Sequence, residues 1–312
     1  MAQTAQRRKT GFALTLQRMS RCWELYLFLL PAIILLILFN YWPMYGIQIA
    51  FRDYKAIKGI TGSPWVGLKH FERLIQLPAF KQIVGNTFSI AALGIVLGFP
   101  FPIMLALILN QLRSNKFKRV VQTVTYLPHF ISTVVLVGML LVFLSPTYGL
   151  WGVIANFFGL DPVNIMGIKS AFKWTYVISG IWQNCGWDAI IYLAALTSID
   201  TSLYEAAQID GANRWQRMWY IDIPSIIPTM TILLIMSSGG FLSVGFDKVF
   251  LMQNDAVLSV SETISTYTYK MAMVNNQFSF STAVSLLNTV VNFVVLFIVN
   301  FIAGKVGETS LW

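Results

Sequence analysis

Six long apolar windows divide this chain of 312 residues, with polar segments between them. A hydrocarbon core about 30 Å thick is crossed by about 20 apolar residues in a helix, and the windows have about that length. With 56% hydrophobic and 11% charged residues, the composition is that of a membrane protein and not of a soluble domain. The expected spans are residues 25–42, 83–109, 120–144, 171–199, 225–246 and 281–303.

Lysine and arginine residues in the connections indicate the orientation of the windows, because cytoplasmic connections are enriched in them. They are dense before the first window and at 110–119, and the connection at 200–224 carries Arg214 and Arg217; the opposite connections hold nearly as many over greater length. We therefore expect an all-α polytopic membrane protein with six transmembrane helices and both termini in the cytoplasm. Its net charge of +9 suits anionic lipid headgroups and does not require nucleic acid. The expected parts are a cytoplasmic segment at 1–24, a membrane domain at 25–303 and a cytoplasmic tail at 304–312.

A polar segment at 203–228, LYEAAQIDGANRWQRMWYIDIPSIIP, separates the fourth and fifth windows. Good helix formers precede Gly211, which favours a turn, and Asn213 is a suitable cap for a second helix. Pro224 and Pro228 are then expected to interrupt helical hydrogen bonding as the chain re-enters the bilayer. One stripe of the second helix would consist of Trp215, Met218, Trp219 and Asp222. The pattern fits a helix, turn and helix that contact a partner and, equally, a solvated loop with aromatic anchors.

Polar residues also lie inside the fourth window, in the sequence WQNCGWDA at 182–189. A charged residue at a helix centre in the bilayer costs about 2.5 to 3.5 kcal/mol, so such groups usually face a cavity or a partner. Amides, carboxylates and aromatic faces are groups that bind sugars. The candidates for a solute path are Asn184, Trp187 and Asp188 in this window and Ser237, Gly240 and Phe241 in the fifth. Close helix packing is the alternative role for the small residues, and Asn288, Asn292 and Asn300 of the last window suit either a path or a bond to a neighbouring helix.

The polar segment resembles the EAA loop of the membrane subunits of binding-protein-dependent ABC importers. The matching residues are Glu205, Ala206, Ala207, Asp210, Gly211, Ala212, Ile221, Pro224 and Pro228. Met218 and Ile223 depart from the family's frequent Phe and Leu but stay apolar. The stretches WVGLKHFERL, FKQIVGNT and YLPHFIS and the ending GETSLW are similar to the sugar-importing, maltose-type branch and, within it, to LplB-type permeases. The resemblance implies the fold of a type I ABC importer permease.

In that family the EAA loop is a coupling helix seated in a groove of an ATPase subunit. The resemblance places Glu205, Ala206, Ala207, Asp210 and Gly211 at this contact. We expect Glu205 and Gly211 to position the loop, and Arg214, Trp215 and Met218 to help fill the interface. It implies as partners a second homologous permease subunit, two ATPase subunits that bind ATP and Mg, an extracytoplasmic solute-binding protein and membrane lipid. The implied solute is a carbohydrate, in particular an oligosaccharide, and the implied location is the plasma membrane of a prokaryote.

The sequence has no nucleotide-binding motif of the form G-x-x-x-x-G-K-S/T, so an ATP site is expected on a partner. It has no G-x-S-x-G or H-E-x-x-H motif, and two histidines and two cysteines give little support for a metal site. We therefore expect a transport subunit without catalytic residues, metal or cofactor of its own. The alternative is an ion- or proton-coupled secondary carrier that relays charge through Asp188, although a carrier has no use for an EAA loop.

Overall fold

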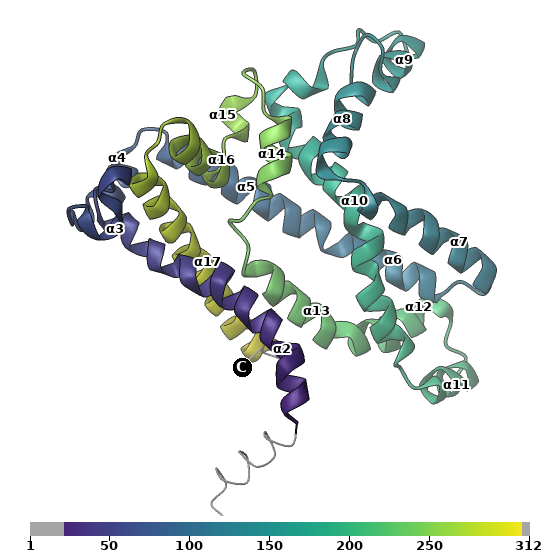
Figure 1. The fold of residues 1–312 in the computed structure, drawn as a ribbon. Coiled ribbons are helices and arrows are strands. Elements are labelled where there is room, and N and C mark those ends of the chain that lie inside the picture. Colours follow the sequence, from purple (N-terminus) through teal and green to yellow (C-terminus); the bar gives the residue numbers. More distant parts are fainter. Residues whose placement is uncertain (1–21, 308–312) are drawn as a thin grey trace, which may run out of the picture. The chain divides into compact units, whose positions relative to one another are not determined.

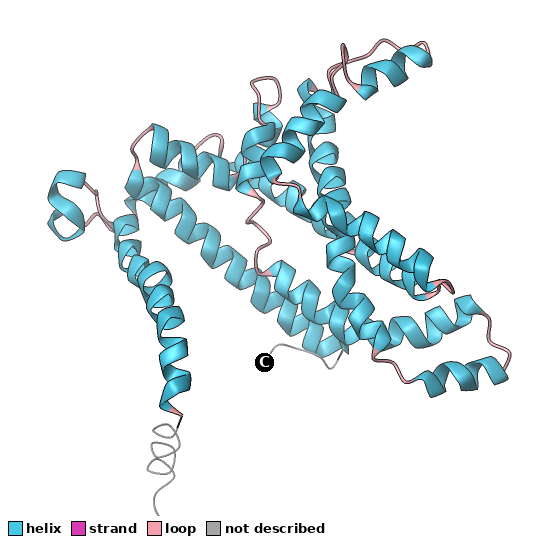
Figure 2. Ribbon diagram, turned by 45° about the vertical axis from the view of Figure 1, so that its right-hand side comes forward, coloured by secondary structure: helices cyan, strands magenta, loops and turns pink. Residues whose placement is uncertain are grey.

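The computed structural model describes residues 22–307 of the chain. Most of the expected cytoplasmic segment at 1–24 and part of the expected tail at 304–312 lie outside the described residues. Contacts divide the chain into two units, Met1–Gly67 and Leu68–Trp312, and each is considered by itself. Apart from two isolated β-bridges, the regular secondary structure of the described residues is helical, as Figure 2 shows. The all-α prediction is therefore confirmed.

The first unit is a long apolar helix followed by a compact loop. Helix α2 (Trp23–Leu36) continues through a π-helical turn, Ile37–Tyr41, into a 3-10 helix, Trp42–Phe51. The α-helical part and the π turn contain no buried residue, which is how a helix that faces lipid would look without its bilayer. Beyond it, a 3-10 turn, Ala56–Lys58, and the short helix α3 (Gly59–Gly62) complete the described part of this unit.

The second unit contains the remaining helices and is organised around the long helix α10 (Figure 1). Its helices are α4 (Lys69–Gln76), α5 (Phe80–Gly98), α6 (Pro100–Asn110), α7 (Asn115–Tyr126), α8 (Thr133–Phe143), α9 (Leu150–Phe157), α10 (Lys169–Thr197), α11 (Thr201–Ile209), α12 (Arg214–Arg217), α13 (Ile223–Ser238), α14 (Phe246–Met252), α15 (Leu258–Ser261), α16 (Ile264–Tyr269) and α17 (Phe278–Gly307). Helices α11 and α12 lie at the same end of the unit as the α6–α7 connection. The first half of α5 contacts α15 and α16, as the hydrogen bonds of Asn86 and Thr87 show.

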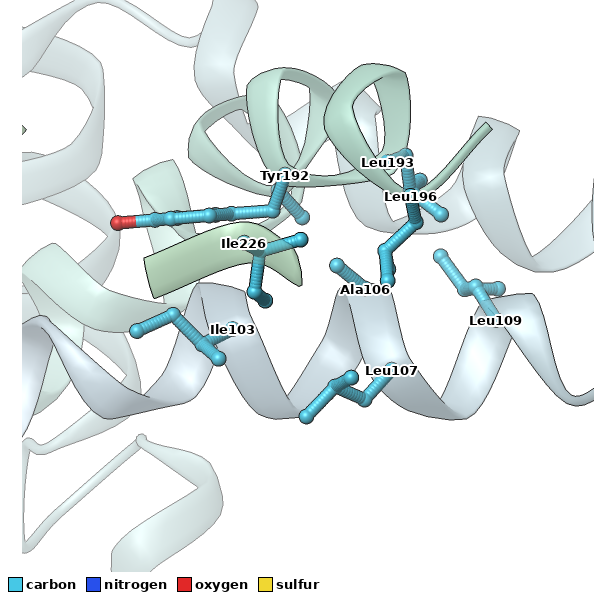
Figure 3. Close-up of a cluster of buried hydrophobic side chains, with 9 residues drawn as sticks. Ile103, Ala106, Leu107, Leu109, Tyr192, Leu193, Leu196 and Ile226 are labelled. Atoms are coloured by element: carbon cyan, nitrogen blue, oxygen red, sulfur yellow. The ribbon is translucent and has the colours of Figure 1, made fainter. Parts of the chain in front are cut away.

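A buried cluster joins α6, α10 and α13 (Figure 3). It comprises Ile103, Ala106, Leu107, Leu109, Ala189, Tyr192, Leu193, Leu196 and Ile226. Ala106 and Ala189 are completely buried, and their small side chains allow α6 and α10 to approach closely. Because α10 ends just before the EAA loop and α13 begins within it, this cluster supports the base of the loop.

Four helices of the described chain are long and apolar enough to cross a membrane, namely Trp23–Phe51, Phe80–Asn110, Arg214–Ser238 and Phe278–Lys305. The expected third span, 120–144, is broken, because Asn115–Phe130 and Thr133–Phe143 meet at 99°. Taken as one span, this bent pair is a fifth. Helix α10 has 29 residues but is not apolar enough to be counted with them, since its middle carries the polar patch.

The expected fifth span, 225–246, is displaced toward the N-terminus, because the continuous helix runs from Arg214 to Ser238. Helix α13 ends at Ser238, and a turn begins at the paired glycines 239 and 240. Asn292 of α17 stabilises the chain beyond this turn, because its Oδ1 accepts from the Leu242 N–H at 2.8 Å and its Nδ2 donates to Ser243 Oγ at 3.1 Å. For Asn292, bonding to a neighbouring segment is therefore the role that the structure shows.

We expect Asn292→Ala to lower the free energy of unfolding by about 1 to 3 kcal/mol, because the buried Leu242 N–H loses its acceptor. Thermal unfolding in detergent measures the effect. Asn275→Ala is the matched control, since the Asn275 side chain is exposed and bonds only the weak acceptor Met271 Sδ. Equal stability of the two variants would contradict the structural role of Asn292.

Candidate functional site

Residues 203–228, the EAA loop, begin as one helix that ends in a tight turn. The N–H of Gly211 donates to the Gln208 carbonyl at 3.1 Å, and the N–H of Ala212 donates to the Ala207 carbonyl at 2.8 Å. This pair of bonds is a Schellman motif, which requires a left-handed residue after the helix. Gly211 has φ of +78°, and an added Cβ would meet nothing within 4 Å. The glycine is needed for its backbone conformation and not for space, so the predicted turn is confirmed.

A second helix starts at the predicted cap, Asn213. Its Oδ1 accepts from the Gln216 N–H at 2.9 Å, and Gln216 Oε1 accepts from the Asn213 N–H at 2.8 Å, which completes a capping box. Helix α12, a π-helical turn, Met218–Asp222, and α13 then follow without a break.

The expected interruption of helical hydrogen bonding near Pro224 and Pro228 takes the form of the π-helical turn Met218–Asp222, and the helix itself continues. Pro224 and Pro228 both lie within the continuous helix Arg214–Ser238, and neither ends it. Proline has no N–H to donate to the helix. In the π-helical turn just before the two prolines, hydrogen bonds join residues five apart instead of four, and this local change accommodates the missing donor. The outcome is a rigid helical connection from the loop into α13.

The outer surface of the EAA loop is exposed and carries large apolar side chains among charged and polar ones. Of the residues expected at an ATPase contact, all except Ala207 and Met218 are exposed, and Met218 packs inward against the α6, α10 and α13 cluster. Sequence reasoning missed Ile209 and Tyr220, which are 87% and 81% exposed; Trp215 and Trp219 are exposed as well. An exposed surface with large apolar side chains is typical of a protein interface.

Asp222 does not belong to that surface, although its spacing from Trp215 and Met218 suggested it. Its side chain is completely buried. One carboxylate oxygen accepts from the Tyr204 hydroxyl at 2.5 Å and the other from Gln111 Nε2 at 2.8 Å. Burial, followed by the hydrogen bond to Asp222, raises the pKa of the Tyr204 phenol, which therefore stays protonated and donates. The three side chains connect α11 and α13 to the end of α6.

A cavity of about 530 Å³ lies between α5, α6, α10, α13 and α14. Three of the predicted path residues, Asn184, Asp188 and Ser237, line it. Gly240 and Phe241 do not, and the Phe241 ring instead packs edge-on against Phe88 at 5.3 Å. The other polar side chains and glycines along its wall are Gly94, Gly98, Tyr176, Gly180, Gln183, Cys185, Tyr192 and Lys248. We call this space the polar cavity.

The α10 polar patch also fills the break between α7 and α8, and Gln183 and Asn184 reach both the break and the cavity. Trp187 stacks on His129 with ring centroids 4.4 Å apart, and Asn184 Oδ1 is hydrogen-bonded to His129 Nδ1 at 3.0 Å. Gln183 Nε2 donates to the Ile131 carbonyl at 2.8 Å, which the broken helix leaves unpaired. A bent backbone at membrane depth needs such partners. Trp187 is thus placed at the break and not in the cavity wall.

Lys248 was not expected in this cavity, because sequence counting treats it only as a topology signal beyond the fifth window. Helix α14 brings its ammonium back against α10, where it donates to the Tyr176 carbonyl at 2.9 Å. The described residues contain no group of three or more His, Cys, Asp or Glu side chains arranged for a metal ion. Among the described residues that line the cavity, Asp188 and Lys248 are the charged ones.

A helical membrane unit with a polar cavity and an exposed, rigidly capped loop has the features of a transport permease. Residues 98–308 match the family described as the binding-protein-dependent transport system inner membrane component, and the chain belongs to this family. The match includes the EAA loop. The sequence resemblance stated above is therefore confirmed.

Two similar proteins come from Bacillus subtilis (strain 168). Over 288 residues the chain is 43% identical to the polygalacturonan/rhamnogalacturonan transport system permease protein YteP, with 92% of this chain and 90% of YteP covered. It is 38% identical to Protein LplB over 288 residues, with 92% and 91% covered. Relatives of this kind are transport components rather than catalysts.

Two solved structures share this fold. A bacterial ABC transporter involved in the import of the acidic polysaccharide alginate has a chain 37% identical to this one, with a TM-score of 0.87 and coverage of 94% of this chain and 99% of that chain. A second structure, of a bacterial alginate ABC transporter in complex with an alginate pentasaccharide-bound periplasmic protein, gives the same TM-score and identity. The described chain thus has the type I ABC permease fold and belongs in a membrane.

Proposed function

We propose that this chain is one of two membrane subunits of an ATP-driven importer whose solute is a carbohydrate, in particular an oligosaccharide. The observation that carries the proposal is the EAA loop, an exposed surface with large apolar side chains that is joined to α10 and α13, the helices that also line the polar cavity. The names of YteP and of the alginate importer support a saccharide as the solute. Asn184, Asp188 and Ser237 supply polar groups suited to sugar hydroxyls.

In the proposed topology, six helices cross the membrane between residues 25 and 303, and both termini are cytoplasmic. Helix α10 is the sixth span, in addition to the four apolar helices and the bent pair. Its polar patch does not face lipid, because its side chains bond to the segment between α7 and α8 or line the cavity. Because successive connections lie on alternate sides of the membrane, the α6–α7 connection and the EAA loop are both on the cytoplasmic side in this topology. The hydrogen bond between Gln111 and Asp222, which joins these two segments, supports that arrangement.

The proposed partners are a second homologous permease, two ATPases that bind ATP and Mg, and an extracytoplasmic solute-binding protein at the opposite face. The ATPase contact consists of Glu205, Ala206, Ala207, Asp210, Gly211, Arg214 and Trp215, with Met218 holding the loop from inside. When the ATPases close, the loop moves with them, and the unbroken connection through α12 into α13 carries the motion to the cavity wall. The chain itself contributes binding and gating.

A secondary carrier that relays protons through Asp188 is not favoured. Such a carrier gives no reason for an exposed loop with large apolar side chains, and the family is one of binding-protein-dependent systems. Uptake in vesicles containing the complete assembly distinguishes the two functions, because it follows ATP in the proposed importer and an ion gradient in a carrier.

Gly211→Val tests the coupling proposal directly. A β-branched residue at φ +78° is strained by about 1 to 2 kcal/mol or more, so the turn opens and the exposed surface is displaced. We expect uptake and solute-stimulated ATP hydrolysis by the complete assembly to fall about tenfold or more, while docking of the solute-binding protein is retained. Gly211→Asn is the matched control, since Asn tolerates this conformation and should keep most activity. Undiminished uptake by Gly211→Val would refute the proposal.

A further inference from the structure

Lys248 is the only basic side chain among the described residues that line the polar cavity, and Asp188 is the only acidic one. The Lys248 ammonium donates to the Tyr176 carbonyl at 2.9 Å and lies 4.8 Å from the centroid of the Tyr176 ring. It takes part in no ion pair; the pair found within residues 22–307 joins Lys270 and Glu262. An ammonium has three donors, so Lys248 keeps donors that no protein carboxylate occupies.

The position of this ammonium is fixed by its surroundings. A Cβ on Gly180 would come within 3.3 Å of Lys248 Nζ, so the glycine provides the room in which the ammonium lies against α10. The Tyr176 ring supports it from one side by a cation–π contact. A cation held in place and lacking a carboxylate is prepared for an anion that arrives with the solute.

The two charged groups lie at different levels of the cavity. Gly180, Asn184, Asp188 and Tyr192 follow one another at intervals of four residues and all line the cavity, so they form one stripe of α10. At 1.5 Å per residue, the level of Gly180 and Lys248 is about 12 Å from that of Asp188. An anion beside Lys248 is therefore well separated from the Asp188 carboxylate. Asp188 is exposed to the cavity and can accept from hydroxyl groups.

We propose that Lys248 binds the carboxylate of an acidic sugar unit, so that the solute is an oligosaccharide containing uronate. This inference rests on the proposed import of a carbohydrate and specifies its chemical class. A neutral sugar would leave the confined ammonium without a counterion, whereas a carboxylate forms a charge-assisted hydrogen bond with it. The hydroxyl groups of the same chain face Asp188 at the other level of the cavity.

Direct binding to the purified permease–ATPase assembly, without the solute-binding protein, tests this inference. The probes are trigalacturonate and its methyl ester, which has the same sugar rings without the charges. We expect the acid to bind at least about tenfold more tightly than the ester. Lys248→Gln should weaken binding of the acid about tenfold or more and leave the ester unchanged, and Lys248→Arg should retain the preference.

Lys173→Gln is the matched control, because it removes one positive charge from α10 outside the cavity lining and should leave both affinities unchanged. Equal affinity of the unmodified assembly for acid and ester, or binding of neither, overturns the inference. The inference is also overturned if Lys248→Gln lowers the affinities for the acid and the ester equally, which would mean that the lysine only joins α14 to α10. ATP-dependent uptake and the Gly211 variants report separately on the proposed function, so its failure is recognised independently.

Discussion

Asp222→Ala is expected to lower the free energy of unfolding by about 3 kcal/mol and to abolish efficient coupling of ATP hydrolysis to uptake. The Asp222 carboxylate is completely buried and accepts from both Tyr204 and Gln111. Hydrogen bonds to a charged group contribute about 1.5 to 3 kcal/mol each, and two half-buried donors would lose their acceptor. Because these bonds hold α11 and α13 against the end of α6, the proposed coupling loop would lose its fixed position.

Thermal unfolding in detergent and solute-stimulated ATPase activity of the complete assembly measure the two effects. Asp200→Ala is the matched control, since this exposed carboxylate caps α11 by accepting from the Ser202 N–H and its loss should cost about 1 kcal/mol. Tyr204→Phe should add little destabilisation in the Asp222→Ala background, because its bond is already lost. Full additivity of the two changes would show that Asp222 does not hold Tyr204.

The second large effect is expected at Gly186. A Cβ at this position would lie 2.1 Å from the Thr125 carbonyl oxygen and 2.4 Å from its carbonyl carbon. Both atoms belong to the backbone of α7, so no side-chain rotation relieves the clash, and α7 and α10 must separate. We expect Gly186→Val to cost about 3 kcal/mol or more and to reduce sharply the yield of monodisperse protein from detergent.

The damage should extend to the break between α7 and α8. Gln183 and Asn184 reach Ile131 and His129 only while the two helices stay in close contact. Gly138→Ala is the control, because that helical glycine has nothing within 4 Å of an added Cβ and alanine is the better helix former. If Gly186→Val and Gly138→Ala are equally well folded, the close approach of α7 and α10 is not a requirement of the fold.

Features that depend on a short stretch of backbone could be predicted from the sequence. The turn at Gly211 and the cap at Asn213 are present, since a left-handed residue and a capping side chain act on neighbouring residues. The apolar windows predicted helices long enough to cross a membrane, and the EAA pattern predicted the protein family. Their ends were less well predicted: the windows at 120–144 and 225–246 ran across a 99° bend and a glycine turn, because apolar composition continues where helical hydrogen bonding does not.

By itself the amino-acid sequence determined that this chain is a helical membrane protein with a capped polar loop, because composition, helical period and turn chemistry act locally. The resemblance of that loop to the EAA pattern then predicted the permease family. Only the tertiary structure decided that Asp222 is buried between Tyr204 and Gln111, that Trp187 packs on His129 and that Lys248 enters the wall of the polar cavity. These roles depend on contacts between helices far apart in the chain. The same charged or aromatic residue is a surface group, a structural bond or a binding group according to the neighbour it meets.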